Sequence, residues 1–387
     1  MKVMILGAFP DSIIKFRGVL IEQLVLQGHD VVVSTAYATS DIIEQIEAIG
    51  ARFVGYKVER NGLNPLADLS TLWQLLKLFR AEQPDKILAY TIKPIIWGGI
   101  AAKLIARTQF YAMITGLGYA FEKGSFKRRL IRGLVKCLYR FSLCSASKVI
   151  FQNNENKLIF IDEKLVNIEK TGRVHGSGVS LTDYAQQPLP EKPITFLLIA
   201  RLLGDKGIRE YAQAAQQVKA KYPEVNFQLV GPFDPSPDGL KSDDVRQWRE
   251  YIDYLGEQKD VRPFIEQCHI YTLPSYHEGL PRTVLEAMAI GRPILTTDVP
   301  GCRDTVINGE NGKLVASKNV DALANAMLWF IENSDEWPVM AQKSREFVET
   351  YFDVNRVNQQ LFSLMELNVK CDNASDNTAQ SADIIVE

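Results

Sequence analysis

Short apolar segments alternate with longer amphipathic segments along most of the chain. The apolar segments are rich in β-branched residues, as buried strands are, and in chain order they read KVMILG, DVVVSTA, ARFVGYKV, DKILAYT, QFYAMIT and KVIFQN. Between them lie stretches with the apolar spacing of helices, such as DLSTLWQLLKLFRAEQ. Regular alternation of strands and helices predicts an α/β fold with a doubly wound parallel sheet.

The same alternation begins again in the second half of the chain. The segments ITFLLIAR, VNFQLVG, CHIYTLPS and PILTTD are each followed by helical sequence, and TGRVHGSGVSLTDYAQQPLPEKP precedes them. We interpret this Gly-, Ser- and Pro-containing segment as a linker and hinge, with a long surface loop as the alternative. The pattern predicts an N-terminal domain over 1–175, a C-terminal domain over 193–350, a helix over 354–367 that packs back on the first domain, and a disordered tail over 370–387.

Composition limits the functional classes. The 387 residues are 46% hydrophobic and 23% charged, which is typical of globular domains, and the net charge of −2 argues against a nucleic-acid partner. Five cysteines form no Cys-x-x-Cys pair, which favours a reducing cytoplasm. The start, MKVMILGAFPD, is too short an apolar run for a signal peptide, and no apolar run reaches the roughly 20 residues of a membrane span. We expect a cytoplasmic protein, attached to a membrane at most at its surface.

The segment SYHEGLPRTVLEAMAIGRP carries two glutamates eight positions apart, Glu278 and Glu286. Pro281 and Gly291 predict a helix over about 281–290, with the proline in its first turn and the glycine at its end. Glu278 then lies in the loop that follows a strand, where ligands of open α/β sheets bind. The free N–H groups of the helix start suit an anion, whereas carboxylates accept hydrogen bonds from hydroxyl groups. The combination predicts a ligand with both phosphate and sugar hydroxyls.

A second cluster lies in IARLLGDKG, which places Arg201 just beyond the first strand of the second domain and Lys206 five residues later. A guanidinium and an ammonium group are the usual protein complement to a diphosphate. The alternative is that the cations are solvated surface charges and that the glutamate inside the helix only complements the helix dipole. Because both clusters fall beyond strand ends of one domain, we favour the binding interpretation.

These residues resemble a known family. The pattern R-x4-K-G at Arg201, Lys206 and Gly207, followed by PSYHEGLPRTVLEAMAIGRPILTTDVPG and VINGENGKLV, resembles the donor-binding domain of the retaining glycosyltransferases of family 4. That family has the GT-B architecture of two facing Rossmann-like domains. A weaker resemblance covers residues 1–370 and is greatest to bacterial enzymes that extend undecaprenyl-diphosphate-linked sugars, such as an N-acetylgalactosaminyltransferase of protein N-glycosylation. RVHGSGVSL replaces the commoner IPNGVD of the family in the hinge segment.

The resemblance implies an activity and roles for these residues. Glu286 is implied to bind the donor ribose, Glu278 the transferred sugar, and Arg201 and Lys206 the diphosphate of a UDP-sugar. Retention implies attack on the face from which the diphosphate leaves, with the acceptor proton passing to a donor phosphate oxygen. The implied acceptor is a polyprenyl-diphosphate-linked saccharide.

Further donor-binding candidates lie on both domains. Gly7 closes the first strand and would let the backbone approach the diphosphate, although a glycine after a strand is a common feature. Val261 and Arg262 match the region where the family meets the nucleobase, and Arg262 is alternatively a helix-surface charge. The remaining candidates are the residues at the start of the predicted helix: Leu280, Pro281, Arg282 and Thr283.

No metal site is predicted from the sequence. The chain has no Asp-x-Asp triplet, and its four histidines show no metal-ligand spacing with one another or with cysteine. Arg201, Lys206 and the helix N-terminus must therefore neutralise the leaving diphosphate, and we expect no cofactor beyond the nucleotide-sugar co-substrate. His269 begins an apolar strand and is expected to be structural, and His277 is given no role.

The segment 123–148, KGSFKRRLIRGLVKCLYRFSLCSASK, is basic and contains no acidic residue. Its apolar residues have helical spacing, which predicts a helix near 127–142 that lies on an anionic membrane surface or guides a lipid diphosphate. The alternative is a core-packed helix with a solvated basic face. The candidate acceptor or membrane residues are Lys127, Arg128, Arg129 and Arg132, together with Gly116 and Gly118 of the preceding TGLGYAFEKG.

Three other interpretations remain open. Sugar-nucleotide epimerases share the architecture, but the spacing of the glutamates and cations is that of a transferase. A nicotinamide-dependent dehydrogenase lacks support, because the first loop, GAFPDS, has no G-x-G-x-x-G. An inactive scaffold is the non-enzyme alternative. The motifs do not specify the sugar, the linkage or the oligomeric state.

Overall fold

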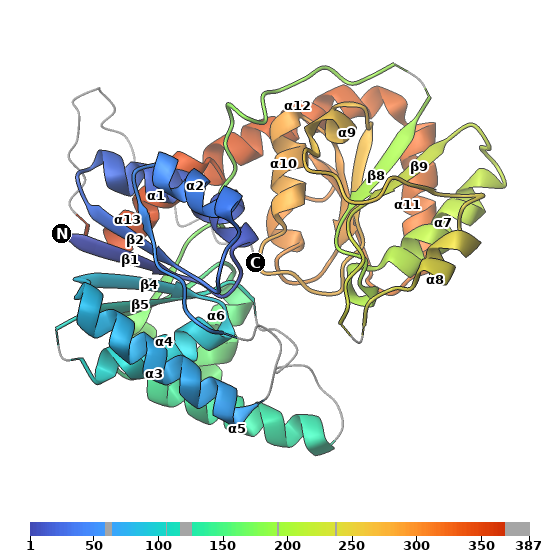
Figure 1. Cartoon of the computed structure of the whole chain (residues 1–387). Coiled ribbons are helices and arrows are strands. Elements are labelled where there is room, and N and C mark those ends of the chain that lie inside the picture. Colours follow the sequence, from blue (N-terminus) through green and yellow to red (C-terminus); the bar gives the residue numbers. More distant parts are fainter. Residues whose placement is uncertain (59–63, 106, 117–125, 192, 237, 368–387) are drawn as a thin grey trace.

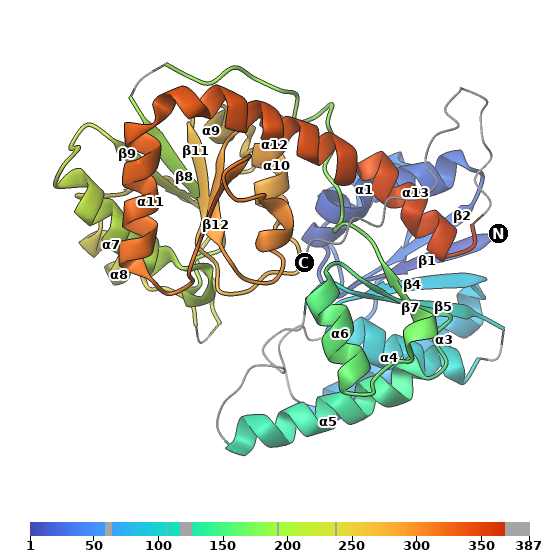
Figure 2. The same cartoon turned by 180° about the vertical axis from the view of Figure 1, so that it is seen from behind.

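The structure contains two parallel β-sheets, each with helices on both faces (Figures 1 and 2). This computed structural model describes residues 1–58, 64–105, 107–116, 126–191, 193–236 and 238–367. The predicted fold class, two Rossmann-like doubly wound domains, is confirmed. Gly118 and the predicted tail over 370–387 lie outside the described residues.

The N-terminal sheet has seven strands in the described part of the chain, and all are parallel to their neighbours. In spatial order they are β3 (Arg52–Phe53), β2 (Asp30–Ser34), β1 (Lys2–Leu6), β4 (Lys86–Tyr90), β5 (Gln109–Ile114), β6 (Lys148–Phe151) and β7 (Thr171–Arg173). The central strands are buried on both faces, which explains their nearly continuous apolar sequence. The strand order reverses between β1 and β4, so ligands are expected beyond the carboxyl ends of these two strands.

Helices cover both faces of this sheet. The first face packs against α1 (Asp11–Leu26), α2 (Ser40–Ala48) and α13 (Val354–Leu364), and the second against α3 (Pro65–Glu82), α4 (Ile92–Lys103), α5 (Phe126–Leu143) and α6 (Asn154–Asp162). Helix α3 begins at Pro65, three residues before the segment DLSTLWQLLKLFRAEQ, because Asn64 caps it by accepting from the N–H of Leu66 and Pro65 occupies its first turn. Both apolar cores are therefore closed by amphipathic helices.

The C-terminal sheet is also parallel. Its strands in the described residues are β10 (Asp253–Tyr254), β9 (Asn226–Val230), β8 (Thr195–Ile199), β11 (Ile270–Leu273), β12 (Ile294–Thr297) and β13 (Gly312–Val315). One face packs against α7 (Ile208–Lys219), α8 (Ser242–Gln247) and α11 (Val320–Glu332), and the other against α9 (Arg262–Glu266) and α10 (Arg282–Ile290). Here the strand order reverses between β8 and β11, so the loops after these two strands form the expected ligand site.

The chain crosses between the two sheets twice. It first crosses after β7, and it returns where α12 (Trp337–Tyr351) is followed by α13. The two crossings meet, since the N–H of Val179 donates to Phe352 O at 2.8 Å and the N–H of Val354 donates to Val179 O at 3.0 Å. Helix α13 then places Val357 and Leu361 in the N-terminal core. The two domains are therefore joined by two chain segments that are hydrogen-bonded to each other (Figure 2).

His269 has the structural role that its sequence predicts. The side chain is buried at the start of β11, and its Nδ1 accepts from the N–H of Thr195 at 3.1 Å. Burial lowers the pKa of His269, so the ring is neutral and able to accept this hydrogen bond.

Candidate functional site

The loop after β8 carries Lys206 at the end of a short 3-10 turn, Gly204–Lys206. Gly207 follows with φ 68°, a left-handed conformation that glycine adopts without strain. A Cβ at Gly207 would lie 2.0 Å from the carbonyl oxygen of Pro274, so only glycine fits between the two loops. This close approach brings the loop after β8 against the loop after β11.

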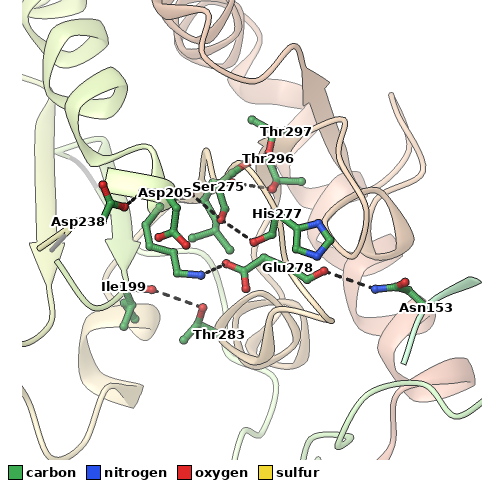
Figure 3. Close-up of polar contacts among 12 residues, drawn as sticks. Asn153, Ile199, Asp205, Asp238, Ser275, His277, Glu278, Thr283, Thr296 and Thr297 are labelled. Atoms are coloured by element: carbon green, nitrogen blue, oxygen red, sulfur yellow. Dashed lines mark hydrogen bonds and ion pairs between the residues drawn. The ribbon is translucent and has the colours of Figure 1, made fainter. Parts of the chain in front are cut away.

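Lys206 and Glu278 form an ion pair at this junction (Figure 3). The distance from Lys206 Nζ to Glu278 Oε1 is 2.7 Å, and the two side chains are 15% and 17% exposed. Burial alone would lower the pKa of Lys206, but the charges of Glu278 and Asp205 outweigh it and the pKa is raised. The ammonium group therefore stays charged in a poorly hydrated place, where its electrostatic effect is larger than in water.

Backbone contacts hold the Glu278 loop in register with the Lys206 turn. The carbonyl oxygen of Asp205 accepts from the N–H of Tyr276 at 2.8 Å and from Ser275 Oγ at 3.2 Å. Burial is the main cause that raises the pKa of the Asp205 carboxyl. The ion pair is thus set on two loops that are fixed to each other.

Helix α10 begins one residue later than the sequence predicts. Its first residue is Arg282, and Pro281 is the N-cap with extended dihedral angles, φ −74° and ψ 106°, rather than a first-turn residue. A proline has a fixed φ that fits both positions, which explains the difference of one residue. Gly291 ends the helix with φ 84°, as predicted.

Glu286 is buried inside α10 and pairs with Arg282 on the preceding turn. Arg282 Nε donates to Glu286 Oε1 at 2.8 Å. The phenol of Tyr184 lies beside the same carboxylate, and its pKa is raised by burial and then by the charge of Glu286. A buried carboxylate with one cationic partner keeps lone pairs that can accept from hydroxyl groups.

Arg282 also contacts the N-terminal domain. Its Nη1 donates to the carbonyl oxygen of Lys15 in α1, and its guanidinium lies 5.3 Å from the ring centroid of Phe16. On the other side of the loop, Leu280 packs so closely against Gly176 that a Cβ there would lie 2.5 Å from Leu280 Cδ2. Of the other helix-start candidates, Thr283 places its Oγ1 3.5 Å from Ile199 O (Figure 3).

The remaining predicted donor residues are more peripheral. Arg201 is exposed and its Nη1 lies 2.6 Å from Asp234 Oδ2. Arg262 is exposed at the start of α9, and its Nη2 lies 2.8 Å from Asp260 Oδ2. Val261 is the N-cap residue of α9. The structure therefore brings Lys206 and Glu278 into contact and pairs the two arginines with other carboxylates.

Gly7 lies directly beyond β1, as predicted. A Cβ at this position would lie 2.6 Å from Tyr90 Oη, so the absence of a side chain leaves room for that ring. The carbonyl oxygen of Gly7 accepts from Tyr56 Oη at 2.7 Å. The packing of Tyr90 is by itself a sufficient reason for glycine at position 7, whether or not Gly7 also contacts a ligand.

The basic segment forms helix α5. Val135, Tyr139 and Leu143 are buried against the N-terminal sheet, whereas Leu130 and Leu134 are 70% and 60% exposed. The sequence shows these apolar residues as one helical pattern, but in the structure some of them lie in the core and others on the surface. Of the predicted cations, Arg129 is exposed and Arg132 is partly buried; the side chains of Lys127 and Arg128 lie outside the described set, and Gly116 is partly buried at the end of the loop after β5.

Several residues at the site were not predicted. Asp234 and Tyr184 contact predicted residues from distant segments, and no local pattern identifies them. Asn153, between β6 and α6, donates to the backbone of the Glu278 loop, and the sequence marks it only as a polar residue in front of a helix.

The ion pair of Arg282 and Glu286 was also not predicted, although both residues were. They are four positions apart in a helix, and this spacing is sufficient to predict the pair.

Two kinds of feature are absent from the part of the chain that the structure describes. Across 1–58, 64–105, 107–116, 126–191, 193–236 and 238–367, no group of three or more His, Cys, Asp or Glu side chains is placed to hold a metal ion. Within the same ranges, no helix combines the length and the apolar character needed to cross a membrane.

The site combines a partly buried cation, Lys206, with two carboxylates beyond the carboxyl ends of β8 and β11. The cation suits an anionic group, the carboxylates suit hydroxyl groups, and α10 begins four residues after Glu278 with the free N–H groups of a helix start. Such an arrangement is able to stabilise negative charge that develops on a leaving group next to a polyhydroxylated ligand.

Comparison with known proteins agrees with this chemistry. Residues 8–153 match the family model described as "Glycosyl transferase 4-like", and residues 181–347 match "Glycosyl transferases group 1". The N,N'-diacetylbacillosaminyl-diphospho-undecaprenol alpha-1,3-N-acetylgalactosaminyltransferase of Campylobacter jejuni is 27% identical over 383 residues, which cover 96% of this chain and 100% of that protein. A UDP-Gal:alpha-D-GlcNAc-diphosphoundecaprenol alpha-1,3-galactosyltransferase of Escherichia coli is 28% identical, covering 68% of this chain and 70% of its own.

Solved structures match the fold over nearly the whole chain. HepE of Anabaena, in complex with UDP, superposes with a TM-score of 0.75 at 20% identity and covers 95% of this chain and 100% of that chain. Sucrose-phosphate synthase of Thermosynechococcus elongatus gives a TM-score of 0.76 at 19% identity, covering 95% and 98%. With both family models matched in order and the architecture shared, the chain belongs to the GT-B glycosyltransferases, with a family 4-like N-terminal domain and a group 1 C-terminal domain.

Proposed function

We propose that this glycosyltransferase moves a hexose or N-acetylhexosamine, with retention, from a UDP-sugar to an undecaprenyl-diphosphate-linked saccharide in the assembly of a bacterial surface glycan or glycoprotein glycan. The observation that carries the proposal is the partly buried pair of Lys206 and Glu278, with the second carboxylate, Glu286, in the helix that follows the Glu278 loop. The Campylobacter relative, whose alignment covers 96% of this chain, is named for such an acceptor, and this supports the choice of acceptor class.

In the proposed donor complex, the carboxylates bind hydroxyl groups and the cations bind phosphate. Glu286 accepts from the ribose hydroxyls and Glu278 from the transferred sugar. Lys206, Arg201 and the N–H groups at the start of α10 balance the diphosphate charge, which grows as the glycosidic bond breaks. We expect this balance to need no metal ion.

The proposed chemical step is a same-face substitution. The acceptor hydroxyl forms the new bond to the anomeric carbon on the face from which UDP leaves, and its proton passes to the departing phosphate oxygen. The bond between the anomeric carbon and that phosphate oxygen breaks, and its electron pair stays with UDP. Lys206 supports this step because its raised pKa keeps it cationic at neutral pH.

Helix α5 supports the proposed position of the enzyme at the cytoplasmic face of the inner membrane. Leu130, Leu134 and Phe141 are each more than half exposed and lie four and seven positions apart, so they share one side of the helix. Arg129 is exposed next to them. Exposed leucines beside cations are typical of helices that lie in the headgroup region of an anionic leaflet.

The test is transfer from radiolabelled UDP-sugars to a synthetic polyprenyl-diphosphate-linked saccharide, with products separated by chromatography. We expect one UDP-sugar to give a lipid-linked product with the α configuration of its donor. Conversion of the UDP-sugar without any acceptor would instead identify an epimerase. If neither reaction occurs and calorimetry detects no UDP binding, the proposed function is wrong and an inactive scaffold is the remaining interpretation.

A further inference from the structure

One backbone segment of the donor site is held by the other domain. Asn153, the residue between β6 and α6 in the N-terminal domain, donates from Nδ2 to the carbonyl oxygen of Gly279 at 2.6 Å, and Glu278 O lies 3.4 Å from the same nitrogen. Figure 3 shows Asn153 approaching Glu278 from a separate element. A residue of the N-terminal domain thus holds the backbone of Glu278 and Gly279 in the C-terminal domain.

The oxygen of the same side-chain amide is also hydrogen-bonded. Asn153 Oδ1 accepts from the N–H of Asn156 at 2.8 Å and so caps helix α6. The side chain is 0% exposed. With the oxygen committed to the helix, the nitrogen is left to face the carbonyl groups of the Glu278 loop. The cap therefore orients the donor, and the amide cannot rotate without losing both contacts.

The peptide has little freedom to move in this position. A Cβ at Gly279 would lie 2.0 Å from the carbonyl oxygen of Thr115, which follows β5 in the N-terminal domain. On the opposite side, Gly301 has φ 81°, and a Cβ there would lie 2.4 Å from Glu278 O. Both glycines allow backbone to pack against backbone. The segment from Glu278 to Gly279 is thus enclosed by the ends of β5 and β6 and by Gly301.

Two ion pairs lie near this contact and also join the domains. Arg303 Nη1 is 3.2 Å from Glu155 Oε1, and Arg173 Nη2 is 3.5 Å from Asp304 Oδ1. Their side chains are partly exposed, and exposed pairs contribute little to stability. A short hydrogen bond from a fully buried amide is the stronger restraint.

We propose that Asn153 is a positioning residue of the transferase. Its amide fixes the peptide of Glu278 and Gly279, and this sets the Glu278 carboxylate against Lys206. The inference rests on the proposed function in that Glu278 binds the transferred sugar. Asn153 itself touches only the backbone of the loop and acts on the substrate through Glu278.

The decisive variant is Asn153→Asp. A carboxylate keeps the oxygen that caps α6 but has no N–H for Gly279 O, so the fold should be retained while the contact between the domains is lost and replaced by repulsion. We expect kcat to fall roughly 5- to 50-fold, the scale of one lost hydrogen bond with added repulsion, and the KM for the UDP-sugar to change less than threefold. The melting temperature should fall only modestly, because separation of the domains lets water reach the new carboxylate.

Asn319→Asp is the matched control. Asn319 caps α11 by accepting from the N–H of Ala322 at 2.9 Å, and α11 lies on the side of the C-terminal domain that faces away from the N-terminal domain (Figure 1). This variant makes the same chemical change at a cap without an inter-domain contact. It should match the parent in kcat.

A second readout does not need activity. Small-angle X-ray scattering of the full chain should give a larger radius of gyration for Asn153→Asp than for the parent and for Asn319→Asp. Gly279→Ala, which introduces a Cβ against Thr115 O, should expand the molecule in the same way. If the Asp variant does not fold, Gly279→Ala still tests the contact by scattering.

Outcomes separate this inference from the proposed function. Unchanged scattering and unchanged kcat in Asn153→Asp would overturn the positioning role, as would a lower melting temperature with normal kcat per folded molecule. A parent that binds no UDP overturns the proposed function instead, and scattering then still decides whether Asn153 holds the domains together.

Discussion

Replacement of Lys206 by methionine tests the cation of the site most directly. Methionine keeps an unbranched stem of similar length and removes only the charge. In the parent, Nζ lies 2.7 Å from Glu278 Oε1 and the two side chains are 15% and 17% exposed. The variant leaves the Glu278 carboxylate poorly hydrated and without its cation.

Two effects of different size follow from this geometry. Loss of one partner from a fully buried pair costs about 3–5 kcal/mol, and since this pair is partly hydrated we expect the free energy of unfolding to fall by about 1–3 kcal/mol. Turnover should fall by roughly 10²–10³, the scale for removing one preorganised group that stabilises a leaving group. Arg201→Ala should cause a comparable loss of turnover with little loss of stability, because its pair with Asp234 is more exposed.

The assay combines steady-state transfer with chemical denaturation. Lys206→Met/Glu278→Gln should recover most of the lost stability, because it removes the unpaired charge, and should recover no activity. Lys343→Met is the control: Lys343 pairs with Glu346 at 2.8 Å, but both side chains are about half exposed at 50% and 47%, so the free energy of unfolding should stay close to that of the parent. Turnover of Lys206→Met within twofold of the parent would refute the role of this cation.

Four further predictions follow. Glu286→Ala should weaken UDP-sugar binding by about 1–3 kcal/mol in calorimetry, since the ribose loses its acceptor; equal affinity would exclude that role. Transfer should be unchanged in excess EDTA, and loss of activity that Mg²⁺ or Mn²⁺ restores would contradict a metal-free step. Changing the α5 cations to Gln should reduce binding to anionic liposomes at physiological salt and slow transfer to a long-chain acceptor more than to a short-chain one; no change in either would leave a solvated helix face. These cations are Lys127, Arg128, Arg129 and Arg132. Burial lowers the pKa of His175 to about 4 from an ordinary value near 6.5. Between these two pH values the unfolded chain binds more protons than the folded chain, so the free energy of unfolding should fall as the pH drops from about 6.5 to about 4. His175→Phe should flatten this dependence in denaturation curves.

The fold was predictable because burial acts on whole segments. Strands of a parallel sheet are covered on both faces, so β1, β4 and β8 must be nearly continuous apolar runs, and the helices between them must be amphipathic. Short edge strands carry less of this signal. The segment ARFVGYKV looks like a full strand, yet β3 covers only Arg52–Phe53. The N–H groups of Val54 and Tyr56 still donate to Val33 O and Thr35 O, so the chain continues beside β2 without forming a regular strand.

The site was predictable only where its residues are close in sequence. Glu278 and Glu286 are set by one loop and one helix, and Lys206 follows its strand at a short distance, so local spacing was enough to bring them to one edge of the sheet. Asn153 lies 126 positions from Gly279, and no local pattern encodes their contact. The division of α5 between buried and exposed leucines also depends on the helix rotation that packing selects, which the apolar spacing alone did not specify.

The spacing of the two glutamates has a physical reason in these ion pairs. Glu278 is balanced by Lys206, and Glu286 by Arg282. Two bare carboxylates at this edge of the sheet would repel a diphosphate, whereas each paired carboxylate still has most of its roughly four lone-pair sites free for hydroxyl groups. The ammonium and guanidinium groups likewise keep unused donors that phosphate oxygens are able to accept. We infer that the pairs neutralise the site for an anion and leave it polar enough for a sugar, which a single glutamate or an unpaired cation would not achieve.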